Sequence, residues 1–392
     1  MKQAIILAAG EGQRLRPFTV TRPKSMLAIA DKPVLHFVIE ALALNGIRDI
    51  IIVVGYRKEQ VFDYMKSGED LGVTLTYVTQ ERQLGTAHAL ARAREKADTE
   101  FLVLPGDNLI DAGTISGFIR AGTPAVLLKR VDNPSRYGVA TTADGMVRRI
   151  EEKPAVAGSN LVNTGIYAFT RDIFNYTGSV LDIPDMLNGM IKDGQSVKAV
   201  ETSGKWLDIV YPWDIITLNN GVLAGLRGQI GGIIEKGVAI KGQVVVGDGT
   251  VIRSGTCIYG PVVIGAGCDI GPQVTIKPAA TFGDNVVVSP FTHIENSVIG
   301  NDVSIGPGCI ISDSVIGTGC RIDGRFTAIS GQVRVPVTNG TVPGIPLGII
   351  MGEDCTVENS VSVQPGTVIG NGCQVNMNKI LNGNIPDKSL VY

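Results

Sequence analysis

The chain has 392 residues, which is long for one hydrophobic core, so two domains are expected. Charged residues make up 18% of the sequence and the formal net charge is −2, which leaves no basic field to attract nucleic acid. No stretch approaches the ~18 uninterrupted apolar residues of a membrane span, and no signal peptide precedes the first predicted strand. The sequence therefore predicts a cytoplasmic protein that binds neither membrane nor nucleic acid.

The first motif follows a short apolar run, residues 2–7, with the length and β-branching of a buried strand. Residues 8–12, AAGEG, then keep large side chains off the backbone, so a ligand can approach closely and exposed N–H groups can bind an anion. Two cations follow, Arg14 and Lys24, on a loop stiffened by prolines. The pattern indicates a polyphosphate ligand, although glycine-rich turns after a first strand are common without one.

The segment Leu7–Lys24, LAAGEGQRLRPFTVTRPK, resembles the signature LAAGxGxRLxPxTxxxPK of the sugar-1-phosphate nucleotidylyltransferases at every fixed position. The resemblance implies that Arg14 and Lys24 are the catalytic residues, which clamp the phosphates. It also implies that the glycine-rich loop holds the nucleotide through Leu7, Ala8, Ala9, Gly10 and Gly12.

Predicted helices and strands alternate after this loop. Their alternation favours a doubly wound, mostly parallel α/β sheet whose ligands bind at the carboxyl ends of the strands. One further amphipathic helix, 211–226, would lead to the second half of the chain. Helices are expected at 33–42, 58–66 and 85–96, and strands at 50–54, 73–78 and 101–104.

The segment Gln80–His88, QERQLGTAH, follows one of these strands. Its amide and backbone groups suit the edge of a pyrimidine, although Gly-Thr is also a plain helix cap. It resembles the family's base-recognition element QxxxLGTAxA, which implies nucleotide contacts at Gln80, Gly85 and Thr86. His88 is expected to pack within the helix and not to act as a base.

Two carboxylates each follow a predicted strand, Asp107 in GDN and Asp208 in KWLD. Mg²⁺ prefers few carboxylates, with phosphates and waters completing its coordination, so either aspartate could be a ligand. The alternative is that Asp-Asn simply forms a turn, in which both residues are common. The two segments resemble the family's GD and WxD elements, which implies that Asp107 and Asp208 share a Mg²⁺ ion.

Three more segments, YG at 137–138, EEKP at 151–154 and NTG at 163–165, offer groups that suit a sugar with hydroxyls and one phosphate. The alternative is that these residues form only a surface charge pair and a turn. The segments resemble the family's sugar-binding elements, and Glu151 can replace Glu152 if the alignment slips by one residue. The implied sugar contacts are Gly138, Glu152 and Asn163, with Lys153 on the phosphate.

From Ile234 to Ile294 an apolar residue recurs every six positions, eleven times in succession. The period resumes at Ile299, breaks through the Gly/Pro-rich segment 325–349, and returns at Met351. This period is the mark of a parallel β-helix. It resembles the left-handed β-helix of hexapeptide acyltransferases, which implies a homotrimer joined through this half. All six cysteines lie here without a CxxC pair, which favours packing inside the solenoid over disulfides or zinc.

A nucleotidylyltransferase half followed by a β-helix resembles the bifunctional enzymes that make UDP-N-acetylglucosamine, including archaeal relatives. Their acetyltransferase half uses a histidine base, and His293 is the histidine of this region. The family's neighbouring tyrosine and the asparagine before Arg325 are missing, and Ile345 and Pro346 replace basic residues. We therefore expect acetyl transfer from acetyl-CoA to glucosamine 1-phosphate to be slow or absent, and a structural β-helix is the alternative.

The sequence thus predicts a nucleotidylyltransferase domain (1–228) and a β-helix domain (229–392). The expected reaction joins an NTP, either UTP or dTTP, to a hexose 1-phosphate of glucose or N-acetylglucosamine type and releases pyrophosphate. Arg14, Lys24 and Mg²⁺ would screen the charge between two anions during the in-line attack. A regulatory nucleotide-sugar sensor is the non-enzymatic alternative, but it would need a damaged charge cluster.

Overall fold

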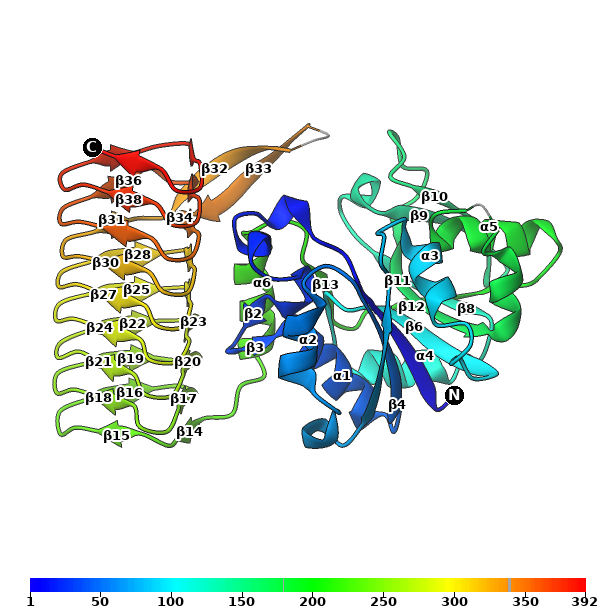
Figure 1. The fold of residues 1–392 in the computed structure, drawn as a ribbon, viewed down its shortest axis with the longest axis horizontal. Coiled ribbons are helices and arrows are strands. Elements are labelled where there is room, and N and C mark those ends of the chain that lie inside the picture. Colours follow the sequence, from blue (N-terminus) through cyan, green and yellow to red (C-terminus); the bar gives the residue numbers. More distant parts are fainter. Residues whose placement is uncertain (179, 338–339) are drawn as a thin grey trace. The chain divides into compact units, whose positions relative to one another are not determined.

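The computed structural model describes residues 1–178, 180–337 and 340–392, which form two compact units (Figure 1). The first unit contains Met1–Glu11, Thr21–Met26 and Pro33–Asp208. The second contains the remainder, which is Gly12–Val20, Leu27–Lys32 and Ile209–Tyr392. The predicted boundary at residue 228 stays a prediction. None of the helices in the described part of the chain is long and apolar enough to cross a membrane.

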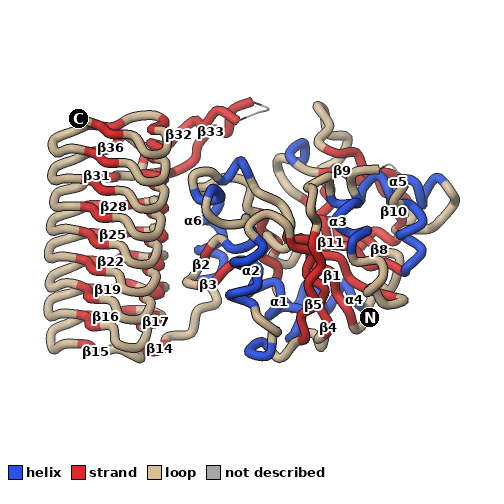
Figure 2. Tube along the Cα trace, in the orientation of Figure 1, coloured by secondary structure: helices blue, strands red, loops and turns tan. Residues whose placement is uncertain are grey.

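A mixed sheet of nine strands lies at the centre of the first unit (Figure 2). The strands stand in the order β5 (Thr74–Thr79), β4 (Asp49–Val54), β1 (Gln3–Ala8), β6 (Glu100–Pro105), β11 (Leu161–Thr170), β8 (Ala125–Arg130), β12 (Lys198–Thr202), β10 (Met146–Glu152) and β9 (Gly138–Ala143). Strands β5, β4, β1 and β6 are mutually parallel, whereas β11 runs antiparallel to β6 and β8. The carboxyl ends of the four parallel strands therefore meet at one edge.

Helices cover both faces of this sheet, as a doubly wound fold requires. Successive residues of β1 point to opposite faces, so Ile6 packs in the core with α1 (Val34–Leu44), α2 (Lys58–Met65) and α4 (Ala112–Ile119). Ile5 packs in the other core with α3 (Thr86–Arg92) and α5 (Ile183–Lys192). The unbroken apolar run of β1 is explained by burial on both sides.

Two predicted helices are longer than the observed ones. Helix α3 ends at Arg92 and not at Lys96, and tight turns such as the one from Lys96 N–H to the Ala93 carbonyl follow it. Helix α6 (Asp214–Leu223) begins after the predicted start at residue 211. The Asp214 carboxylate accepts the N–H groups of Val210 and Tyr211, both at 2.8 Å, and so holds that segment as a turn.

The second unit is dominated by a left-handed β-helix that runs from β14 (Gln229–Ile230) to β41 (Leu390–Val391) (Figure 1). Its strands stack into three parallel sheets, and each coil contributes one strand to each sheet. Ile234 pairs with Ile252, eighteen residues on, and Phe282 pairs with Ile299 where the repeat loses one residue. The six-residue period predicted from sequence therefore corresponds to the buried position of each strand, and these residues form one continuous core.

The predicted break in the repeat is a β-hairpin inserted between two coils. Strand β32 (Gly331–Val337) pairs antiparallel with β33 (Gly340–Leu347), and Gly331 faces Leu347 (Figure 2). The repeat continues at β34 (Ile349–Met351), which pairs in parallel with β29 (Val315–Ile316) of the coil before the insertion. Val333 and Val335 alternate with polar residues at the start of β32, a pattern that favours a strand.

The cysteines line the β-helix as predicted. All six are free thiols, and every one but Cys257 is buried. Desolvation raises the pKa of Cys309 to about 11, so this thiol stays protonated and unreactive near neutral pH. No group of three or more His, Cys, Asp or Glu side chains that could hold a metal occurs in residues 1–178, 180–337 and 340–392.

Two short N-terminal segments pack with the β-helix in the second unit. Asn219 of α6 is fully buried, and its Oδ1 accepts both the Ala30 N–H (3.0 Å) and the Thr281 hydroxyl (2.8 Å). In the turn between β2 (Ala28–Ile29) and β3 (Lys32–Pro33), desolvation and then the charge of Asp284 raise the pKa of Asp31 to about 6. Side chains of the β-helix unit thus bond and charge-couple to a loop only a few residues beyond Lys24.

Candidate active site

The motifs found separately in the sequence meet at the carboxyl edge of the four parallel strands. Gly106 N–H donates to the Leu7 carbonyl (2.9 Å), which places the turn containing Asp107 beside the glycine-rich loop. Gln80 follows β5 at the same edge, and its N–H donates to the Val54 carbonyl (2.8 Å). This edge is where a doubly wound sheet binds its ligand.

The glycine-rich loop leaves its backbone accessible at one point. Leu7 is half-buried, Ala8 and Ala9 are buried, and Gly10 is exposed. A Cβ on Gly10 would meet nothing within 4 Å, so its missing side chain leaves room for a ligand. Gly12 has φ 76°, a left-handed conformation that favours glycine.

Gly12 and Arg14 belong to the second unit, while Lys24 belongs to the first. Arg14 lies in the short 3₁₀ helix η1 (Gln13–Leu15), and its side chain is exposed. Its assignment as a catalytic residue, and that of Gly12 as a nucleotide contact, stay predictions.

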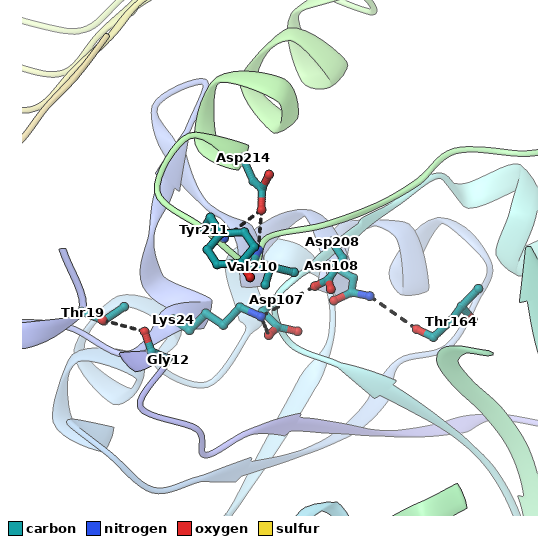
Figure 3. A network of polar contacts seen from close by, with 10 residues as sticks. All are labelled: Gly12, Thr19, Lys24, Asp107, Asn108, Thr164, Asp208, Val210, Tyr211 and Asp214. Carbon is teal, nitrogen blue, oxygen red and sulfur yellow. Dashed lines mark hydrogen bonds and ion pairs between the residues drawn. The ribbon is translucent and has the colours of Figure 1, made fainter. Parts of the chain in front are cut away.

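Lys24 faces both predicted metal ligands (Figure 3). Its ammonium contacts the Asp107 carboxylate and lies 3.6 Å from Asp208 Oδ1. All three side chains are about one-fifth exposed, so the charges are partly desolvated but still reachable. The two carboxylates come together because β7 (Asn108–Ile110) pairs with β13 (Trp206–Asp208), with Asn108 opposite Asp208.

Asn108 is a site residue that the sequence reading did not single out. In one orientation its amide makes a single long bond to the Thr164 carbonyl (3.4 Å), and in the other it makes three good ones. We assign the second orientation because it satisfies every partner. The amide then donates to Asp107 (2.9 Å) and Asp208 (3.2 Å) and accepts from the Trp206 indole (2.8 Å). The asparagine directly after Asp107 was the available signal.

The donor set fits Mg²⁺. Two carboxylates already share one cation, the Lys24 ammonium, and Mg²⁺ normally takes one or two carboxylates together with phosphates and waters. Asp107 and Asp208 are therefore the residues that would hold the ion.

Hydrogen bonds join the residues that were predicted to contact the base. The Gln80 side chain is buried, and its amide nitrogen lies 3.1 Å from the Gly85 carbonyl and 2.9 Å from His88 Nδ1. His88 is half-buried and thus holds the Gln80 amide through a polar contact, whereas only packing within the helix was expected of it. Thr86 Oγ1 donates to Asp182 (3.0 Å), a residue that the sequence reading missed because it lies almost a hundred positions away.

The predicted sugar-binding residues also lie together in the first unit. Glu152 pairs with Gly138 across β10 and β9, and a Cβ at Gly138 would come within 3.0 Å of Glu152 Oε2. Lys153 Nζ lies 2.9 Å from Glu152, and Asn163 donates to the Tyr167 hydroxyl (2.7 Å). The cluster joins hydroxyl-binding groups and one cation, as a sugar phosphate needs.

His293 lies on β25 (His293–Glu295) of the β-helix. Its Nε2 is 3.5 Å from Glu295, and Lys277 is also 3.5 Å from that carboxylate. A shallow groove of about 440 Å³ adjoins this cluster and is lined by Lys241, Gly242, Tyr259, Gly260, Lys277 and Pro278. Two lysines and a histidine thus gather on one face of the solenoid.

The fold and the charged edge define a nucleotidyl-transfer enzyme, and the comparisons agree. Residues 3–224 match the family model described as nucleotidyl transferase, and residues 258–342 match the one described as the GMPPB C-terminal domain. The chain belongs to the nucleotidyl transferase family, and it is an enzyme of the sugar-1-phosphate nucleotidylyltransferase type.

Curated relatives match along almost the whole chain. The bifunctional protein GlmU of Methanocaldococcus jannaschii is 34% identical over 99% of this chain and 97% of its own length. A bifunctional sugar-1-phosphate nucleotidylyltransferase/acetyltransferase of Sulfurisphaera tokodaii is 33% identical over 88% and 94%. A solved structure from Bacillus anthracis, provisionally described as a glucose-1-phosphate thymidylyltransferase, shares 30% identity with a TM-score of 0.51 over 55% of this chain and 93% of that one.

Proposed function

We propose that the first half of the chain transfers a nucleotidyl group from UTP or dTTP to a glucose- or N-acetylglucosamine-type hexose 1-phosphate. The observation that carries the proposal is the contact of Lys24 with Asp107 and Asp208 at the carboxyl edge of the sheet. A metal-binding carboxylate pair with an adjacent cation is what a reaction between two polyanions requires.

The proposed chemistry needs alignment more than it needs a base. The attacking phosphate oxygen is already an anion, so the residues must hold it in line with the α-phosphorus and screen the charge. Lys153 and Glu152 hold the sugar phosphate, and Lys24 and Arg14 neutralise phosphate oxygens. Mg²⁺ bound to Asp107 and Asp208 would supply further charge neutralisation. Gln80 and Thr86, oriented by His88 and Asp182, hold the base.

The test is pyrophosphate release across a matrix of nucleoside triphosphates and sugar 1-phosphates. Lys153→Ala should raise KM for the sugar phosphate more than KM for the nucleotide. If none of the sugar 1-phosphates in the matrix led to pyrophosphate release, the assignment would be contradicted. An equal effect of Lys153→Ala on both KM values would contradict it as well.

Acetyl transfer by the β-helix is the second candidate. It is favoured by the acetyltransferase named in the Sulfurisphaera tokodaii relative and by the cluster of His293, Lys277 and Glu295 beside the groove. Acetyl-CoA would be its co-substrate. The missing tyrosine and asparagine keep our expectation at slow transfer.

A homotrimer joined through the β-helix and a cytoplasmic location also stand as proposals. Large apolar side chains are exposed along the solenoid, which supports an interface there. Sedimentation of the full chain should give three times the monomer mass, and a monomer would contradict the assembly. The exposed apolar side chains of the solenoid include Ile233, Val287, Ile310, Ile380 and Leu390.

A further inference from the structure

The loop that carries Arg14 has a defined structure of its own. Gly12 carbonyl accepts both the Leu15 N–H (2.9 Å) and the Thr19 hydroxyl (2.8 Å), which closes residues 12–20 into a compact turn. Leu15, Phe18 and Thr19 are buried, whereas Arg14 is exposed. The buried side chains therefore anchor the turn, and Arg14 is exposed on its surface.

One β-helix side chain is bonded to this turn. Asn371 lies at the corner between β37 (Thr367–Ile369) and β38 (Gln374–Val375), and its Nδ2 donates to the Pro17 carbonyl at 3.0 Å. Residues 12–20 belong to the same compact unit as Asn371, although they are continuous in sequence with the glycine-rich loop of the first unit. A residue more than 350 positions away thus holds the signature motif.

The Asn371 amide is itself held by the neighbouring coils. Its Oδ1 accepts the Glu353 N–H (2.8 Å) from the preceding coil, and its Nδ2 also donates to Asp387 (3.3 Å) in the next coil, which accepts the Asn371 backbone N–H as well (2.7 Å). The orientation of the side chain is therefore fixed before it meets Pro17. Asn301 makes the same kind of bond between coils, accepting the Asp284 N–H at 3.0 Å, but in the described part of the chain it is not bonded to residues 12–20.

We infer that Asn371 is a positioning residue for nucleotidylyl transfer, which acts by fixing the turn that carries Arg14. The inference rests on the proposed function. A charged group that must meet phosphates loses effect when its loop shifts by a fraction of an ångström to one ångström. Asn371 would act in this way through the turn alone, without touching a substrate.

The kinetic test compares Asn371→Ala with Asn301→Ala, the matched control that loses only a bond between coils. Loss of one partly buried hydrogen bond predicts that Asn371→Ala lowers kcat about fivefold to tenfold. Asn301→Ala should leave kcat within about twofold of the wild-type value, although its Tm should change about as much as that of Asn371→Ala. In an Arg14→Ala background, Asn371→Ala should have almost no further effect, because both changes act through one group. Equal kcat values for the two variants, or independent effects in the double variant, would overturn the inference.

A second readout does not depend on activity. Trypsin can cleave after Arg14, which is exposed, and cleavage requires the turn to open. Asn371→Ala in the full chain should accelerate this cleavage several-fold relative to both wild type and Asn301→Ala. Unchanged cleavage would refute the positioning role. A wild-type protein that releases no pyrophosphate would refute the proposed function instead.

Discussion

The Lys24 ammonium faces both the Asp107 and the Asp208 carboxylate in the first unit, so one positive charge offsets only part of two negative charges. Mg²⁺ would need the same carboxylate oxygens, so the ammonium and the metal compete for them. If Asp107 and Asp208 held Mg²⁺, Lys24 would be in a position to meet the phosphates of the substrate. Under the proposed function, one lysine would thus have two electrostatic roles.

This competition predicts two opposite effects of Lys24→Ala. Removal of a cation that stabilises developing charge should lower kcat by about 10²-fold to 10³-fold. The metal should bind more tightly, because the carboxylates have lost their internal partner, so half-maximal activity should need less Mg²⁺. Mg²⁺ titration of activity and calorimetry of metal binding check both effects. A higher Mg²⁺ requirement in the variant would contradict the proposed competition.

Asp107→Asn and Asp208→Asn should each lower turnover by at least about 10²-fold, because a metal ligand supplies several kcal/mol of charge stabilisation. Asp111→Asn is the matched control: Asp111 caps α4 by accepting the Thr114 N–H (2.8 Å), also accepts the Lys205 N–H (2.6 Å), and is not one of the two proposed metal ligands. It should keep most of its activity. Wild-type turnover that persists in excess chelator would disprove the metal assignment.

The turn between β2 and β3 gives a prediction at the scale of one element. Desolvation, with the nearby Asp284 charge second, raises the pKa of Asp31, while Lys32 opposes the shift. The folded state therefore favours the protonated carboxyl, which stabilises the protein fully below about pH 4 and loses that effect as pH rises towards about 6. The Asp31 side chain is exposed, so water screens part of this effect on stability.

Asp31→Asn should accordingly be more stable than wild type at pH 7 and equally stable at pH 4. Asparagine tolerates the φ of 73° at this position, so the backbone should not change. Thermal unfolding of both proteins between pH 4 and pH 7 measures the difference in Tm. A difference that does not change with pH would show that Asp31 titrates normally.

At the scale of the whole molecule, the open question is whether the β-helix catalyses. We expect thiol release from acetyl-CoA with glucosamine 1-phosphate to be slow or absent, and His293→Ala to leave nucleotidylyl transfer unchanged. Thiol-reactive dye and pyrophosphate assays on the same preparation separate the two activities. Rapid thiol release that needs both the amino-sugar phosphate and His293 would make the enzyme bifunctional.

Local patterns determined most of the architecture. The six-residue period predicted the β-helix because each coil repeats the same buried position, and alternating elements predicted the doubly wound sheet. The motifs at Leu7, Gly106 and Gln80 lie together at the carboxyl edge, since parallel strands end there together. The predicted start of a helix was wrong where side-chain hydrogen bonds hold the chain in a turn, as Asp214 does before α6.

The contacts between distant segments were decided by the tertiary structure alone. No local pattern indicates that Asp182 holds Thr86, that Asn108 joins two carboxylates, or that Asn371 holds the turn of Arg14. No periodic pattern in the sequence indicates these bonds, because each depends on how separate strands and coils pack in the folded protein. The sequence by itself determined the chemistry of the site, and packing across the chain decided which residues hold that chemistry in place.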